Sequence, residues 1–133
     1  MRRIVHLAFA ALCVLAAATA SAQDFPSRAI RLVVPYPPGG PTDLVARIYA
    51  GKMGEIFGQP VVVENRPGGI GTIGLNLVAR ATPDGHTFGL MAMPSLLAPT
   101  MLPSVPFDIV ADLAPVIQTN WESHLLVVRA SSP

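Results

Sequence analysis

The sequence lacks the features that mark several common protein classes. It has one cysteine, Cys13, one tryptophan and only 13% charged residues among its 133 residues. A single cysteine excludes a domain stapled by disulfides, and the sparse, balanced charge excludes a basic arm that binds nucleic acid. Because 51% of the residues are hydrophobic, the chain is also unlike a disordered tail. These absences leave a globular domain with an apolar core.

The first segment differs from the rest of the chain. It begins with Arg2 and Arg3, continues through an apolar run over residues 8–18, and ends in Ala20-Ser21-Ala22. This order is typical of a secretory signal peptide. The apolar run is too short to cross a bilayer, and no later run reaches about 18 uninterrupted apolar residues. We therefore predict a signal peptide over residues 1–22, with a buried helix or a retained anchor as the alternative.

Cleavage between Ala22 and Gln23 would change the composition. Cys13 would leave with the signal peptide, and the loss of Arg2 and Arg3 would turn the formal net charge from +1 to about −1. The mature chain then has no electrostatic reason to bind nucleic acid or anionic lipid, so we expect no nucleic-acid partner and no membrane insertion. An exported domain without cysteine indicates the bacterial periplasm.

Turn residues divide the mature chain into short apolar runs. All 14 prolines and all 11 glycines lie after residue 22, and they cluster between the runs instead of spreading through them, as in a folded domain. Such runs are typical of strands that are buried on both faces of a parallel sheet. The predicted strands are Ile30–Val34, Val61–Val63 and Phe88–Ala92, with a last apolar strand at Leu125–Val128.

Helices are predicted between these strands. Apolar residues recur at three- and four-residue steps over 42–57, and a shorter helix fits 70–81. Alternating strands and helices predict an α/β fold, with a right-handed βαβαβ parallel sheet and flanking helices. Gly51 and Gly54 should each cost the first helix about 1 kcal/mol relative to alanine, so tertiary packing must hold it. The apolar face predicted for this helix comprises Leu44, Val45, Ile48, Tyr49, Met53, Ile56 and Phe57.

The segment from Tyr36 to Asp43 is the first candidate site. It follows the first predicted strand and opens the first helix, which is where open α/β sheets bind ligands. Prolines make such a loop stiff, glycines let a ligand approach the backbone, and free amides at a helix N-terminus suit a carboxylate or phosphate. The alternative is a rigid turn without a ligand, capped by Thr42 or Asp43. The candidate residues are Tyr36, Pro37, Pro38, Gly39, Gly40, Pro41, Thr42 and Asp43.

Asp43 needs a separate interpretation. A carboxylate near an anion site would repel the ligand, so we expect this side chain mainly to cap backbone N–H groups.

The loop after the second predicted strand carries a G-x-G-x-x-G pattern at Gly69, Gly71 and Gly74. This pattern favours, as an alternative, a small exported oxidoreductase that binds a nucleotide. Two observations count against it. The fingerprint belongs after the first strand, and the acidic residue expected about 20 residues further on is replaced by Met91-Ala92-Met93-Pro94.

No arrangement in the sequence argues for catalysis or for a metal. His86 lies beside Asp84 in a predicted turn, where we expect it to be solvated, and His124 has no cysteine or acidic cluster at metal-ligand spacing. Neither Ser95 nor Ser123 lies in a G-x-S-x-G elbow. We therefore predict a binding protein without a cofactor and not an enzyme.

Several longer motifs resemble one known family. The run PSRAIRLVVPYPPGGPTD over residues 26–43 resembles the opening of the tripartite tricarboxylate transporter substrate-binding proteins, the Bug family. The resemblance continues through GQPVVVENRPGGIGTIG at 58–74, ARATPDGHTFGLM at 79–91 and LPSVPFDIVADLAPV at 102–116. It covers essentially the whole mature chain in family order.

The resemblance implies a periplasmic-binding-protein-like lobe of type II. Two such lobes would close on a small carboxylate, and the protein would deliver it to membrane permease subunits. The ligand site of this lobe would include the loop 37–43, with Gly68, Gly69 and Ser95 on neighbouring loops. The third of these loops, 93–96, is more apolar than is typical of the family.

The resemblance also sets the expected domain boundaries. Residues 23–117 would form an incomplete first lobe, and residues 118–133 would lead towards a second lobe. Because family members are much longer, we expect a truncated chain that is marginally stable alone and binds weakly or not at all. An inactive truncated product is a further alternative.

Overall fold

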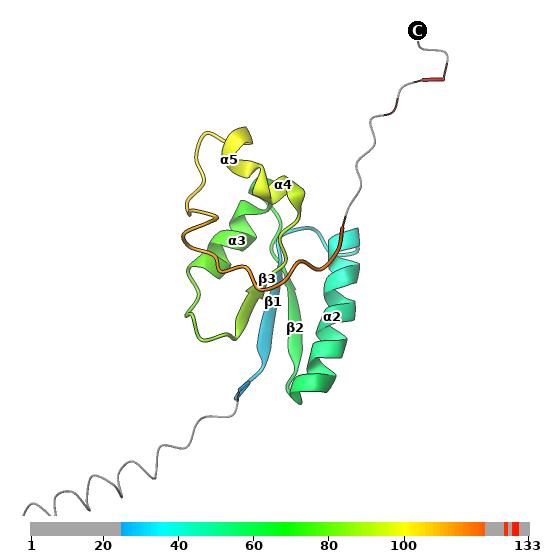
Figure 1. The fold of residues 1–133 in the computed structure, drawn as a ribbon, viewed down its shortest axis with the longest axis vertical. Coiled ribbons are helices and arrows are strands. Elements are labelled where there is room, and N and C mark those ends of the chain that lie inside the picture. The colour runs from blue at the N-terminus through cyan, green and yellow to red at the C-terminus, as the bar shows by residue number, and fades with distance from the viewer. Residues whose placement is uncertain (1–24, 122–126, 128, 131–133) are drawn as a thin grey trace, which may run out of the picture.

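The computed structural model describes residues 25–121, 127, 129 and 130. The predicted signal peptide and its cleavage site lie outside these residues, as does the predicted strand Leu125–Val128 except for Val127. In chain order the elements are β1 (Ile30–Val34), α2 (Pro41–Phe57), β2 (Val61–Asn65), the 3-10 turn η1 (Gly69–Gly71), α3 (Thr72–Ala79), β3 (Thr87–Gly89), α4 (Met93–Leu96) and α5 (Ala98–Met101) (Figure 1).

The three strands form one parallel sheet in the order β2-β1-β3. From the central strand β1, the chain first moves outward to β2 and then returns past β1 to β3. Helix α2 packs on β1 and β2, whereas α3 packs on β1 and β3. The two helices lie on opposite sides of the sheet (Figure 1). The predicted α/β fold with a parallel βαβαβ sheet and flanking helices is therefore confirmed.

The core beneath α2 depends on small residues in the helix. Leu32 and Val34 of β1 pack with Ala46 and Ala50, which are four residues apart and nearly free of solvent contact. Alanine side chains at this spacing lie on one face of the helix, so the helix backbone can lie close to the sheet. On the opposite side of the sheet, Gly89 of β3 also allows close packing. Because it has no side chain, its backbone can lie against α3.

The prediction of which face of α2 packs against the sheet is wrong in part. Leu44, Ile48 and Ile56 are 62%, 63% and 69% exposed, and the buried face is instead formed by Asp43, Ala46 and Ala50. Two faces of the helix carry apolar residues, and periodicity counts the larger side chains. The sheet selects the face whose side chains are small enough to allow close approach.

The element boundaries also differ from the prediction, since β3 spans Thr87–Gly89 instead of Phe88–Ala92 and two loops differ as well. The helix predicted over 70–81 begins with η1, because Gly68, Gly69, Ile70 and Gly71 all have positive φ angles that a regular helix excludes. After β3, the segment expected to be a loop over 93–96 is the short helix α4. It begins next to Pro94, whose fixed φ suits the first turn of a helix.

Gly51 provides a test of the α2 packing. It lies on the exposed side of α2, and a Cβ added there would meet no atom within 4 Å. We expect Gly51→Ala to raise the free energy of unfolding by about 1 kcal/mol, because alanine loses less backbone entropy in a helix. Urea denaturation followed by circular dichroism would measure the change.

Gly74→Ala is the matched control for this substitution. A Cβ at Gly74 would lie 2.8 Å from the Cβ of Pro35 and 2.9 Å from the carbonyl oxygen of Arg66. This variant should therefore be destabilised. A loss of stability in Gly51→Ala comparable to that in Gly74→Ala would contradict the placement of Gly51.

Candidate functional site

The loops that follow the three strands emerge at one edge of the sheet, because parallel strands end on the same side. The segment from Pro35 to Gly40 connects β1 to α2, the segment from Arg66 to Gly68 connects β2 to η1, and α4 begins shortly after β3. The connections after β1 and β3 lead to opposite faces, which makes the junction between these strands a topological switch point. Ligands of open α/β sheets bind at such a junction.

The start of α2 has backbone amides that no side chain caps. The N-cap is Gly40, with no side-chain cap, and Pro41 occupies the first turn. The backbone N–H groups of Gly40, Thr42 and Asp43 have no hydrogen-bond partner within the described residues. The expected cap by Thr42 is therefore wrong, whereas Asp43 binds a backbone N–H group of the preceding loop, that of Gly39.

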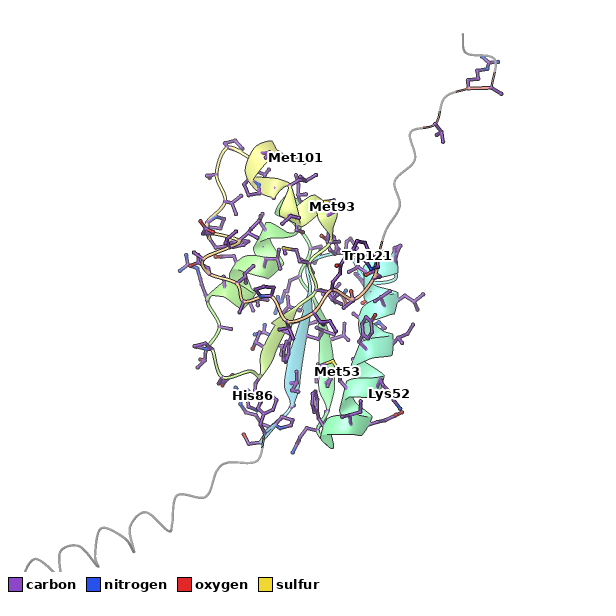
Figure 2. The ribbon with its side chains drawn as sticks, in the orientation of Figure 1. Lys52, Met53, His86, Met93, Met101 and Trp121 are labelled. Atoms are coloured by element: carbon purple, nitrogen blue, oxygen red, sulfur yellow. The ribbon has the colours of Figure 1, made fainter. Side chains whose placement is uncertain are left out.

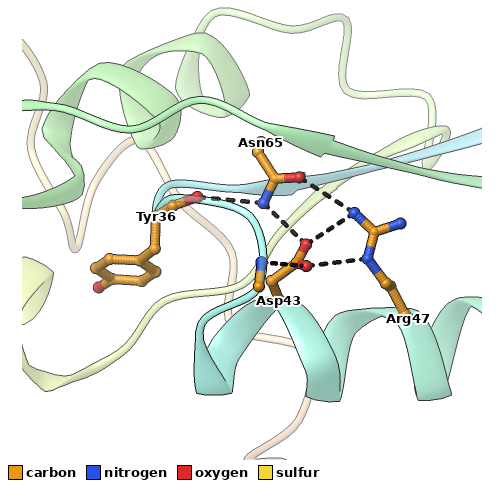
Figure 3. A network of polar contacts seen from close by, with 5 residues as sticks. Tyr36, Asp43, Arg47 and Asn65 are labelled. Carbon is orange, nitrogen blue, oxygen red and sulfur yellow. Dashed lines mark hydrogen bonds and ion pairs between the residues drawn. The ribbon is translucent and has the colours of Figure 1, made fainter.

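Asp43 accepts hydrogen bonds from three directions (Figure 3). Its Oδ2 accepts from the Gly39 amide at 2.9 Å and from Nε of Arg47 at 2.9 Å. Its Oδ1 accepts from Nη2 of Arg47 at 3.1 Å and from Nδ2 of Asn65 at 2.9 Å. The Asp43 residue is only 3% exposed. As expected, this carboxylate binds a backbone N–H group, although the group belongs to the loop before the helix.

These contacts keep Asp43 ionised. The hydrogen bond from Arg47, then those from the Gly39 amide and Asn65, lower the pKa of the Asp43 carboxyl to about 2. The Arg47 guanidinium lies four residues along the same helix and forms an ion pair with the carboxylate. The buried charge is thus compensated within α2.

A second polar contact joins the loops of all three strands. Ser95 of α4 is fully buried, and its Oγ donates to the carbonyl oxygen of Ile70 at 2.8 Å. Since a hydroxyl has one proton, the Tyr36 hydroxyl donates to Ser95 Oγ at 2.5 Å. In this arrangement neither hydroxyl has a proton left for a ligand. The predicted ligand contacts of Tyr36 and Ser95 stay predictions.

The glycines of the second loop are explained by close packing. A Cβ at Gly71 would collide with Ser95 Oγ, and one at Gly74 would lie 2.8 Å from Pro35. Gly68 and Gly69 have φ angles of 127° and 55°, which favour glycine. The G-x-G-x-x-G pattern therefore has a structural reason that involves no nucleotide.

Sequence reasoning did not single out two residues of this network. Arg47 belongs to no motif in the sequence, although its four-residue spacing from Asp43 indicates an ion pair. Asn65 has no signal of its own in the sequence, yet its side-chain amide donates both to Asp43 and to the carbonyl oxygen of Tyr36. The register that brings β2 beside β1 is what places Asn65 there.

His86 lies at the opposite end of the sheet (Figure 2). The expectation that it is solvated is wrong, because it is 6% exposed and its ring contacts Phe25 edge-on with centroids 5.0 Å apart. The described residues contain no group of three or more His, Cys, Asp or Glu that could hold a metal. Among the helices of this described part, none is long and apolar enough to cross a membrane.

Comparison with known proteins gives a consistent result. The family model described as "Tripartite tricarboxylate transporter family receptor" matches residues 45–133. A UPF0065 protein of Bordetella pertussis is 42% identical over 134 residues, which cover all of this chain and 40% of that protein. Protein BugT of the same species is 43% identical over 115 residues, covering 85% of this chain and 35% of BugT. The chain thus spans well under half the length of these relatives.

Solved structures show the same fold. A structure titled as a periplasmic transporter has a TM-score of 0.56 and 42% identity, covering 63% of this chain and 29% of that one. A solute-binding protein from Polaromonas has a TM-score of 0.55 and 39% identity, covering 58% and 27%. An R. palustris protein solved with adipate has a TM-score of 0.50 and 43% identity, covering 51% and 23%. The expected likeness to a periplasmic binding protein is confirmed.

The low pKa values of two carboxyl groups predict how stability depends on pH. The pKa of Glu64, like that of Asp43, is lowered to about 2, chiefly by its hydrogen bond with Arg31. A carboxyl whose pKa is lower in the folded state stabilises the fold fully above its unfolded pKa, about 4. We therefore expect the free energy of unfolding to fall as the pH is lowered from about 4 towards 2.

Urea unfolding at a series of pH values would measure this loss. Asp43→Asn should show a flatter pH dependence than the wild-type chain, because one of the carboxyl groups with a lowered pKa is gone. An equal slope in both proteins would contradict the contacts assigned to Asp43.

Proposed function

Because this chain belongs to the tripartite tricarboxylate transporter receptor family, we propose that it is part of a periplasmic solute-binding protein that captures a small carboxylate. The captured carboxylate would pass to membrane permease subunits. The family consists of periplasmic solute-binding proteins, which supports a binding role and export through the predicted signal peptide at residues 1–22. The R. palustris neighbour solved with adipate, a dicarboxylate, supports this class of ligand.

The observation that carries this proposal is the set of amides at the start of α2 that have no hydrogen-bond partner among the residues the structure describes. The N–H groups of Gly40, Thr42 and Asp43 lie at the positive end of a 17-residue helix, at the switch point of the sheet. Such amides bind a carboxylate without a cationic side chain. The amides of Gly69 and Ile70, in the neighbouring loop, also have no hydrogen-bond partner in the described part of the chain.

The other predicted ligand residues contribute in different ways. Pro37, Pro38 and Pro41 have no N–H group, and they restrict the loop to few conformations. The Gly39 amide is already bound to Asp43, so it contributes to loop shape and not to ligand contact. Gly68 and Gly69 keep the second loop free of side chains where a ligand would approach.

The alternative of a nucleotide-dependent oxidoreductase has less support. Family membership favours a binding protein, and two glycines of the supposed fingerprint, Gly71 and Gly74, are required by packing against Ser95 and Pro35. The absence of a fluorescence change on titration of NADH into the chain is the result expected here.

Gly40→Ala tests the proposed site with little effect on the fold. The φ of Gly40 is −79°, and a Cβ there would meet only the Pro37 carbonyl oxygen, at 3.5 Å. We expect the free energy of unfolding to fall by no more than about 1 kcal/mol. Affinity for adipate should fall about tenfold or more, because the new methyl group stands where the carboxylate approaches the backbone.

The measurement is an NMR titration of the labelled chain with adipate, which suits weak affinity. In the wild-type chain the amides of Gly40 and Thr42 should shift, and Gly51→Ala, which adds the same methyl group at a remote position, should bind like wild type. Two results would contradict the proposal. One is equal affinity of Gly40→Ala and wild type, and the other is no shift of these amides at any adipate concentration.

A further inference from the structure

The contacts of Asp43 form a closed set around the proposed ligand loop. The carboxylate holds the loop near its end through the Gly39 amide. It holds the loop near its beginning through Asn65, whose Nδ2 donates to Asp43 at 2.9 Å and to the carbonyl oxygen of Tyr36 at 3.1 Å. Both amide protons of Asn65 and both carboxylate oxygens of Asp43 are thereby used. The side chain of Asp43 therefore has no free position from which to bind a ligand.

The negative charge of Asp43 would oppose the binding of an anion, and the positive charge of Arg47 compensates for it. Asp43 is ionised and buried at the third position of α2, directly beside the amides proposed to hold a carboxylate. An uncompensated carboxylate at this place would repel the ligand. The Arg47 guanidinium lies against both carboxylate oxygens, while its own side chain is 54% exposed. The pair contributes little net charge to the site.

We propose that Asp43 is a positioning residue of the carboxylate site and that Arg47 is its required counter-charge. Asp43 fixes the loop from Tyr36 to Gly40 without touching the ligand. Arg47 keeps the network neutral, so that an anion can bind beside it. This inference rests on the proposed function, which it deepens by assigning separate tasks to two side chains one turn apart on α2.

The first test measures the loop without any ligand. In amide hydrogen exchange by NMR on the whole chain, the Gly39 amide should be protected, whereas the Gly40 amide, which has no partner within the described residues, is the internal reference. Asp43→Ala should speed exchange at Gly39 about tenfold or more and leave the amides of β1 unchanged. Equal exchange rates of Gly39 and Gly40 in the wild-type chain would overturn the positioning role.

The second test separates charge from shape, with adipate as the probe. Arg47→Met leaves Asp43 uncompensated, so affinity for adipate should fall about tenfold or more at low salt and recover partly at high salt. The double variant Asp43→Asn with Arg47→Met should return to within about threefold of wild type, because asparagine accepts the Gly39 N–H without a charge. If Arg47 had only a structural role, the affinity of Arg47→Met for adipate would not depend on salt in this way, and the added Asp43→Asn substitution would not restore it.

The outcomes distinguish the two proposals. A double variant that binds as weakly as Arg47→Met, or an Arg47→Met chain that binds like wild type, would overturn the counter-charge role of Arg47. A wild-type chain that binds no adipate, together with a protected Gly39 amide, would contradict the proposed function and leave the positioning role supported by the exchange data.

Discussion

The parallel pairing of β1 with both of its neighbours is the constraint on which the rest of the structure depends. Because β1 lies between β2 and β3 and runs in the same direction, the three following loops meet at one edge of the sheet. The crossovers place α2 and α3 on opposite faces of the sheet, and ligands of such sheets bind at the resulting junction between β1 and β3. Residues far apart in the sequence reach one place because of the topology.

Two small polar networks then fix the loops at this edge. Asp43 and Asn65 join the loop after β1 to the end of β2. Ser95 joins α4 to Tyr36 and to the carbonyl oxygen of Ile70. Side-chain donors are largely used up by these internal contacts, so the groups left for a ligand are mainly backbone amides. A site of this kind recognises the carboxylate group and leaves the rest of the ligand to other contacts.

Much of this arrangement can be predicted from the sequence, because its signals are local. Short apolar runs bounded by turn residues place β1 and β2, and the apolar periodicity places α2 within one residue of its bounds. The face of α2 that packs cannot be read in this way. Ala46 and Ala50 are buried because they are small, a property that hydrophobic periodicity does not weigh.

The same distinction between local signals and tertiary packing applies to the site residues. The loop from Tyr36 to Asp43 carries a recognisable proline and glycine pattern, whereas Asn65 joins the network only through the register of β2 against β1. Ile70 is a branched residue with a φ of 55°, a conformation that no local rule predicts for its type. Its carbonyl oxygen is held by Ser95 from a distant part of the chain.

The central claim is that backbone amides at the start of α2 hold the carboxylate. A crystal structure of this chain with adipate tests it most directly. We expect a carboxylate oxygen within about 2.7–3.2 Å of the amide nitrogen of Gly40 or Thr42. Adipate bound elsewhere, with those amides facing only solvent, would contradict it.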